Sequence, residues 1–113
     1  MNINRGEIWL ANLDPTFGSE IRKTRPVVIV SNNTNNKHNS VVTILPITSN
    51  TSHVYAFEVF IPAGMGNLPK DSKAKADQVR ILDKVRLIKI IGILPSHIVQ
   101  LVDGAMKLHL DLP

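Results

Sequence analysis

A charged loop directly before an apolar strand holds the side chains most able to do chemistry. It carries one acid, Glu20, and the bases Arg22, Lys23 and Arg25, and the apolar segment 26–31 follows at once. A loop that enters a buried strand holds its side chains in fixed positions. The following proline keeps Arg25 extended, and its guanidinium stays charged at any working pH, so it can hold a phosphate but cannot accept a proton. A solvated surface loop is the alternative.

A second group of polar side chains lies at the ends of other predicted strands. Thr48 stands at the exit of an apolar strand, where its hydroxyl can project into a pocket built by neighbouring loops. Asp77, Gln78 and Arg80 come later in the chain. Asp77 and Arg80 could simply pair on the surface, which contributes at most about 1 kcal/mol to stability. A purely structural explanation is weaker for Thr48.

Metal and cofactor sites are not expected. The four histidines show no metal-ligand spacing, and no carboxylate cluster accompanies them. The absence of cysteine excludes disulfides, thiolate nucleophiles and zinc–thiolate sites. The Gly-Met-Gly segment at 64–66 lacks the third glycine and the helix of a phosphate-binding loop, so it predicts a plain turn.

Length and composition indicate one small domain over residues 1–113. The hydrophobic share is 43% and the aromatic share 4%, so aliphatic side chains must build the core. A net charge of +4 and a pI near 9.7 favour polyanionic partners only modestly. We find neither a signal peptide nor the roughly 20 apolar residues of a membrane span, and we expect a cytoplasmic protein that binds no membrane.

Apolar patterning predicts six strands, at residues 7–13, 26–31, 41–47, 57–61, 73–82 and 86–94. The strand at 26–31 is apolar on both faces and should be central, whereas 57–61 alternates and should bury one face. The strand at 73–82 should be long or bent. Pro46 cannot donate a ladder hydrogen bond and predicts a bulge or an edge just before Thr48. The asparagine-rich stretch 32–39 is predicted to be a loop.

The last segment has helical periodicity. Ser96 is the predicted N-cap, and the predicted apolar face consists of Ile98, Leu101, Val102, Ala105, Leu108 and Leu112. Gly104 costs such a helix about 1 kcal/mol relative to alanine, so packing should hold it in place. The predicted fold is therefore mainly β, a small barrel or strongly coiled sheet with one C-terminal helix.

Four short motifs follow one another along the chain at compatible spacing. They are Arg5-Gly6-Glu7-Ile8-Trp9 with Leu13-Asp14-Pro15-Thr16, Gly18-Ser19-Glu20 with Arg25-Pro26-Val27-Val28, Pro46-Ile47-Thr48-Ser49, and Asp77-Gln78-Val79-Arg80. Each is weak alone, but the ordered set is specific. In these motifs the chain resembles the MazF/PemK-type toxins of bacterial toxin–antitoxin pairs, which are sequence-specific RNA endonucleases.

The resemblance implies an SH3-like, barrel-like twisted antiparallel sheet with a C-terminal helix, assembled as a homodimer. It also implies metal-independent cleavage of single-stranded mRNA by attack of the ribose 2′-OH, leaving a cyclic phosphate and a 5′-hydroxyl. Arg25 and Thr48 would lie at the scissile phosphate, and Glu20 matches an acid that is functional in some relatives only. Lys75 would replace a basic residue found two positions before the Asp-Gln pair.

Residue chemistry agrees with these roles. Arginine and threonine can stabilise the charge that builds on phosphate oxygens, and Glu20 is the one ionisable base candidate in its loop. Arg22 and Lys23 would hold flanking phosphates, while Asp77 and Gln78 could read the base edges of single-stranded RNA. The basic side chains Arg22, Lys23, Arg25 and Arg80 would also attract an acidic antitoxin segment.

Two other readings stay open. Toxins of the same fold related to CcdB cleave nothing and inhibit a protein target such as gyrase. Those relatives act through a C-terminal aromatic residue, whereas this chain ends in Leu-Asp-Leu-Pro. A barrel that only binds RNA is the third possibility.

Overall fold

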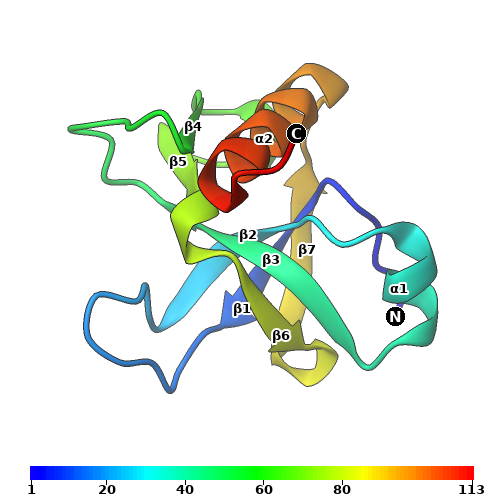
Figure 1. The fold of residues 1–113 in the computed structure, drawn as a ribbon. Helices are drawn as coiled ribbons and strands as arrows, with labels where there is room; N and C mark the ends of the chain where they lie inside the picture. The colour runs from blue at the N-terminus through cyan, green and yellow to red at the C-terminus, as the bar shows by residue number, and fades with distance from the viewer.

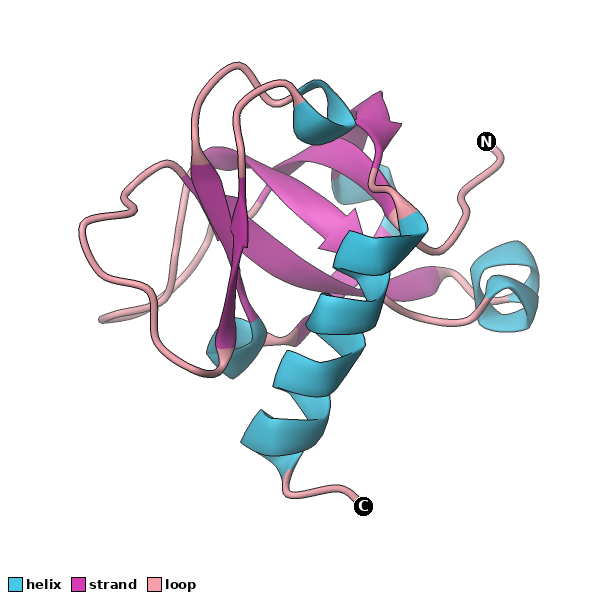
Figure 2. Cartoon of the chain, turned by 90° about the horizontal axis from the view of Figure 1, so that it is seen from above, coloured by secondary structure: helices cyan, strands magenta, loops and turns pink.

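Seven strands form one antiparallel sheet in the computed structural model, which describes residues 1–113. They are β1 (Glu7–Asn12), β2 (Thr24–Ile29), β3 (Val41–Thr48), β4 (Glu58–Ile61), β5 (Ser72–Lys75), β6 (Arg80–Asp83) and β7 (Leu87–Ile93). The order is β4-β5-β3-β2-β1-β7, with β6 paired to β3. The sheet is strongly coiled and the helix α2 (Ser96–Leu110) lies across it (Figures 1 and 2). The mainly β prediction with a C-terminal helix is confirmed.

The central strands β2 and β3 face a hydrophobic cluster on each side of the sheet. Val28 and Leu45 belong to the cluster that also receives α2, whereas Val27 and Ile44 belong to the second cluster. Successive side chains of a strand point to opposite faces, so a strand buried on both faces must be apolar throughout. This explains the continuous apolar run of β2.

Strand β3 changes its neighbour along one edge. Its first half pairs with β6, ending at Ile44 opposite Arg80, and its end pairs with β5, beginning at Ile47 opposite Ala74. Pro46 lies in the gap between the two ladders while still opposing β2 on the other edge. A residue without an N–H is tolerated at such a break, which agrees with the interruption predicted before Thr48.

The predicted strand 73–82 is broken into β5 and β6 by the 3₁₀ turn η2 (Ala76–Gln78). Two further 3₁₀ turns, η1 (Met65–Asn67) and η3 (Lys84–Arg86), link the neighbouring strands. The close approach of β7 to η1 requires a glycine, since a Cβ on Gly92 would lie 2.2 Å from the carbonyl oxygen of Gly66. The η2 corner carries Asp77 and Gln78 out of the sheet.

The predicted loop at 32–39 is wrong in part, because the helix α1 (Asn33–His38) forms there. Its asparagines supply the hydrogen bonds that the helix ends lack. The Asn32 side chain accepts from the N–H of Asn35, and Asn36 is only 1% exposed while its Nδ2 donates to the Ser31 carbonyl. A stretch too polar for hydrophobic burial is thus ordered by local side-chain bonds.

The helix α2 differs from its predicted form in two respects. Pro95, not Ser96, occupies the N-cap position, and no side chain caps it. Only Ile98, Val102 and Ala105 of the predicted apolar face are buried. The leucines of that face are exposed, at positions 101, 108 and 112. No helix of the structure has both the length and the apolar character needed to cross a membrane.

Candidate active site

Arg25 and Thr48 lie at equivalent ends of two paired strands. The outermost residue pair between β2 and β3 is Val27 with Pro46. Two residues further towards the same end, the antiparallel register places Arg25 opposite Thr48. Because side chains two residues apart share a face, both point to the same side of the sheet. Both also line one recess of about 170 Å³, closed on its other side by residues 68–70 and Ser72.

The polar atoms of this pair are free to meet a ligand. Arg25 is half-buried, its Nε donates to the Arg22 carbonyl at 3.3 Å, and it forms no ion pair. Thr48 Oγ1 accepts from the N–H of Asn50 at 3.2 Å. That acceptor role leaves the hydroxyl proton available to donate. An uncompensated guanidinium beside a donating hydroxyl is a suitable environment for a phosphate-sized anion.

Two further recesses follow: the second shares Thr48 with the first, and the third shares Ile21 and Gln78 with the second. The next has a volume of about 230 Å³, and Thr48, Lys75 and Gln78 are among its walls. The third, of about 280 Å³, lies beyond Gln78. Its lining includes Glu20, Asp77, Gln78 and Arg80. The three recesses together, called the groove below, bring most of the predicted site residues onto one surface.

Glu20 shares no recess with Arg25 or Thr48. Glu20 is exposed and lines only the third recess, and its carboxylate accepts from the N–H of Phe17 at 3.3 Å. Arg22 and Lys23 are exposed on the same loop and line none of the three recesses. The charged residues of this loop are close in sequence, but they do not form one cluster in the structure.

The loop at 13–23 is fixed to the sheet by side chains that the sequence suggested as ligand contacts. Gln78 accepts from the N–H of Ile21 at 2.7 Å and donates to the Ser19 carbonyl at 3.1 Å. Arg80 Nη1 donates to the Leu13 carbonyl at 3.2 Å. This loop and the loop at 49–57 project from the same side of the molecule (Figures 1 and 2). They flank the groove.

A buried carboxylate that sequence reasoning missed supports the groove wall. The Glu58 side chain is fully buried and accepts from Lys73 Nζ at 3.0 Å and from Lys75 Nζ at 2.5 Å. It also accepts from the N–H of Tyr55 at 2.9 Å. Strand alternation had placed Glu58 on the outer face. The available signal was a pair of lysines two residues apart on a neighbouring strand.

The surroundings of Glu58 keep it charged. Desolvation alone would raise the pKa of Glu58, but hydrogen bonds from Lys75, the Tyr55 N–H and Lys73 together outweigh it, and the pKa lies below its ordinary value of 4.5. Lys75 therefore has a carboxylate partner before any ligand arrives, and its Nζ also lies 3.8 Å from Asp77 Oδ1. That Asp77 oxygen is buried and accepts no hydrogen bond.

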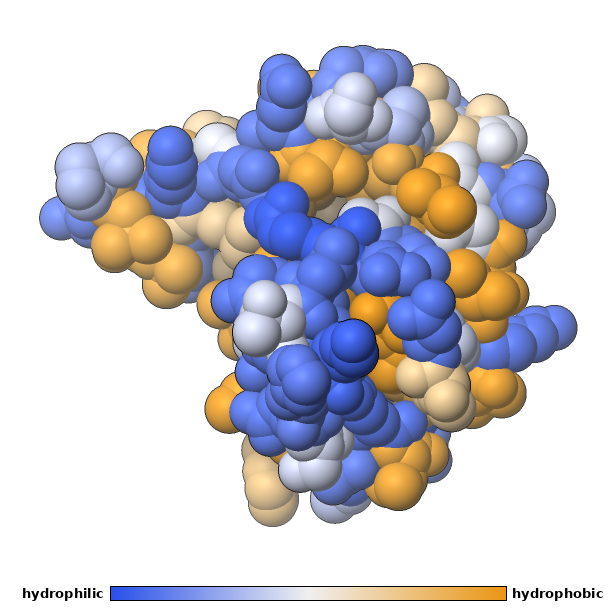
Figure 3. Space-filling model, turned by 90° about the vertical axis from the view of Figure 1, so that its right-hand side faces the viewer, coloured by the Kyte–Doolittle hydropathy of each residue, from blue (hydrophilic) through white to orange (hydrophobic).

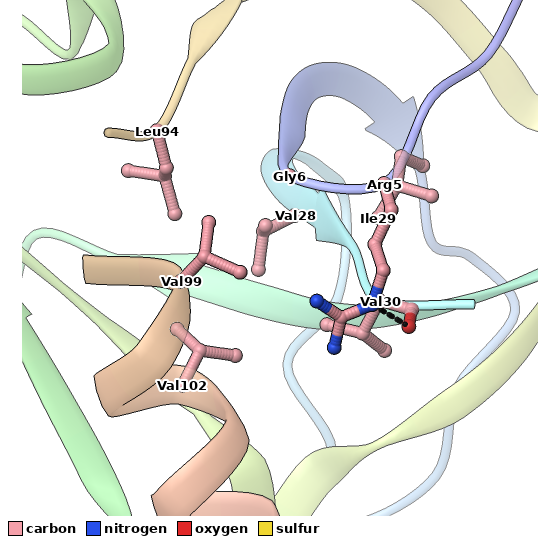
Figure 4. A pocket seen from close by; sticks show the side chains of 8 residues that line it. All are labelled: Arg5, Gly6, Val28, Ile29, Val30, Leu94, Val99 and Val102. Carbon is pink, nitrogen blue, oxygen red and sulfur yellow. Dashed lines mark hydrogen bonds between the residues drawn. The ribbon is translucent and has the colours of Figure 1, made fainter. Parts of the chain in front are cut away.

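A separate apolar crevice lies between α2 and the ends of β1 and β2 (Figure 4). Arg5 crosses it and donates from Nε to the Val30 carbonyl at 2.9 Å, while another of its nitrogens pairs with Asp103 on α2. The crevice has no room even for a water molecule. It holds the helix in place and is not a ligand site.

Comparison with known proteins decides the family. Residues 4–110 match the family described as PemK-like, MazF-like toxin of type II toxin–antitoxin system. The chain belongs to this toxin family. It is also 42% identical over 115 residues to endoribonuclease MazF9 of Mycobacterium tuberculosis (strain ATCC 25618 / H37Rv), with 97% of this chain and 98% of that protein covered.

Solved structures of MazF toxins share the fold. The crystal structure of MazF from Deinococcus radiodurans superposes with a TM-score of 0.87 at 26% identity, covering 99% of both chains. A MazE–MazF crystal structure from the same organism gives a TM-score of 0.81 at 25% identity, covering 100% of this chain and 99% of that chain. The coiled sheet and terminal helix of this PemK/MazF-family chain are therefore the family fold.

Proposed function

We propose that this PemK/MazF-family chain is a sequence-specific, metal-independent endoribonuclease that cleaves single-stranded mRNA in the cytoplasm. The observation that carries the proposal is the pairing of an uncompensated Arg25 with Thr48 across one small recess. The similarity to an endoribonuclease over nearly the whole chain supports the same activity.

The reaction proposed is attack by the ribose 2′-oxygen on the adjacent phosphorus. A bond forms between these atoms, the bond from phosphorus to the 5′-oxygen breaks, and a 2′,3′-cyclic phosphate and a 5′-hydroxyl result. The 2′-hydroxyl gives up its proton and the leaving oxygen gains one. Negative charge builds on the non-bridging oxygens, where the Arg25 guanidinium and the Thr48 hydroxyl stabilise it.

Proton transfer is not assigned to Glu20. A general base must lie within hydrogen-bond reach of the proton that it takes, directly or through one water. Glu20 lines the third recess and Arg25 with Thr48 the first, so the carboxylate belongs to a different part of the groove. We assign Glu20 to the RNA path and not to the reacting atoms.

The rest of the groove suits a single strand of RNA. The Asp77 side chain is 29% exposed and lines the third recess, where its carboxylate can accept from an exocyclic amino group of a nucleobase. Lys75 and Arg80 give this wall positive charge, and the exposed Arg22 and Lys23 can reach phosphates outside it. Gln78 has less freedom to read bases because its amide already holds the adjacent loop.

Two protein partners follow from the same proposal. The antitoxin would be an acidic segment that competes with RNA for the basic groove, and a MazE–MazF crystal structure exists for a relative. A second copy of the chain would cover exposed apolar side chains such as Ile81, Val85 and Ile88. Apolar patches also surround a hydrophilic centre on the face that carries α1 (Figure 3).

The direct test is incubation of the purified protein with mixed-sequence RNA in EDTA, followed by sequencing of the cut ends. We expect discrete cuts at a short shared sequence, with cyclic phosphate on one product and 5′-hydroxyl on the other. Arg25→Ala should suppress them by at least about 100-fold, the loss typical of one transition-state donor. Intact RNA across varied single-stranded substrates would contradict the proposal.

A further inference from the structure

Four aromatic and imidazole rings form a column along the loop 53–57 and the end of α2. The ring centroids of His53 and Tyr55 lie 4.0 Å apart, and Tyr55 stacks on Phe57 at 5.5 Å with their planes 3° apart. Phe57 lies 6.3 Å from His109 of α2. Tyr55 is 52% exposed, and His53 at the outer end of the column is exposed as well. One end of the column therefore presents open ring surface.

The column is attached to the groove through Lys73. Lys73 Nζ donates to the His53 carbonyl at 2.6 Å and lies 6.0 Å from the centroid of the Tyr55 ring. Lys73 also lines the same recess as Thr48. Lys73 thus contacts both the ring column and the groove, so the column lies next to the groove wall.

Glu58 holds this arrangement rigid from below. Its carboxylate accepts from the Tyr55 N–H and from Lys73, and the Glu58 N–H donates to the Tyr55 carbonyl at 2.9 Å. These contacts fix the loop at Tyr55, on which the outer ring of His53 rests. A preorganised ring loses little freedom when a ligand stacks on it.

The position and composition of the column favour a nucleobase as its ligand. The chain has only five Phe, Tyr and Trp residues, and two of them stand in this column. Aromatic faces joined to a positively charged groove are the pattern by which proteins hold single-stranded nucleic acid. We propose that the column is a stacking platform for a base of the RNA strand whose phosphate lies between Arg25 and Thr48, which rests on the function proposed above.

If the column had only a structural role, its removal would affect RNA binding in a different way. In that case the rings only tie the loop 53–57 to α2, and removing the outer ring of His53 would weaken the binding of every substrate equally. A stacking platform instead gives a loss that depends on one base of the substrate. The difference can be measured even if the variants are somewhat less stable than the parent protein.

The experiment uses a short RNA built around one mapped cut, with 2′-deoxyribose at the cut so that it binds without reacting. His53→Ala removes the outer ring and should raise the Kd of this RNA by about 5- to 100-fold, as expected for one lost base stack. His53→Phe keeps a ring at this position and should bind like the parent. A series of RNAs with one abasic position each should contain a position at which the parent and His53→Ala bind equally.

The outcomes separate the two proposals. An abasic position that abolishes the His53→Ala loss supports the platform and identifies the stacked base. An equal loss at every position, with RNA still cleaved by the parent, overturns the platform and leaves the nuclease intact. Failure of the parent to cleave any RNA overturns the nuclease and the platform with it.

Discussion

The Gln78 side chain accepts a hydrogen bond of 2.7 Å from the backbone N–H of Ile21, 57 positions earlier in the chain. The same amide donates to the carbonyl of Ser19, so one side chain at the η2 corner holds both sides of Glu20. Gln78 of the Asp-Gln motif therefore ties the η2 turn to the loop 13–23. The loop acquires its shape from a residue on the opposite wall of the groove.

Gln78→Ala should release this loop without unfolding the sheet. Two hydrogen bonds are lost, each worth about 1 kcal/mol, and the Ile21 amide should exchange with solvent markedly faster. Amide hydrogen exchange followed at Ile21 measures this directly, and amides of the buried strand β2 serve as the internal control. Unchanged protection at Ile21 would show that the loop is held by other contacts.

Glu58→Gln should destabilise the protein by about 3 kcal/mol, because two largely buried lysines lose their carboxylate partner. The matched control is Asp103→Asn, which removes the more exposed pair with Arg5 and should cost at most about 1 kcal/mol. Urea unfolding of both variants gives the comparison. Similar losses for the two would mean that burial does not distinguish these ion pairs.

The contribution of Glu58 to stability should depend on pH. Its pKa is lower in the folded protein than the ordinary 4.5, so its stabilising effect is present above that value and disappears as pH falls through the folded pKa. The stability difference between the parent and Glu58→Gln should thus be constant near neutral pH and shrink below pH 4.5. A difference that grows on acidification would contradict the charged state of Glu58.

Gly104→Ala should stabilise the protein by up to about 1 kcal/mol, since alanine is the better helix former. A Cβ at this position would meet no atom within 4 Å, and the residue is exposed on α2. Thermal or urea unfolding measures the gain. A loss of stability would indicate that this helix surface is covered in solution, for example by a second copy of the chain.

Arg22→Gln and Lys23→Gln should each weaken RNA binding and reduce its dependence on salt. One phosphate contact on a single strand contributes about 0.7 to the slope of log K against log salt. Lys37→Gln on α1 is the control, because it removes an exposed lysine on the side of the molecule away from the two loops (Figure 1). An equal change in slope for Lys37→Gln would show that only total charge matters.

The sequence predicted the strands and helix that depend on hydrophobic periodicity. It was less successful for elements whose structure depends on hydrogen bonds between polar groups. The apolar strands and α2 follow from their pattern, but the pattern does not show which face of a helix the sheet covers. Leu101 was expected inside and is 56% exposed. Helix α1 was missed because its asparagines bond to one another and to Ser31, an arrangement that hydrophobicity does not record.

The sequence predicted which residues line the candidate site better than it predicted how they are arranged. The opposition of Arg25 and Thr48 depends on the register of β2 and β3, which pairing fixes only in the folded sheet. Glu20 lines a different recess from that pair, in a loop that Gln78 holds by hydrogen bonds to the residues on either side of Glu20. Glu58 was assigned to the outer face by strand alternation alone, and its two lysine partners lie on β5, a different strand.

The most direct test of the central claim is a double-mutant cycle on single-turnover RNA cleavage with Arg25→Gln, Thr48→Val and the double variant. If both side chains act on one phosphate, their effects on the transition state are coupled. The double variant should then cleave about as slowly as the slower single variant. Losses that simply multiply would show that the two residues act independently and would contradict a shared phosphate site.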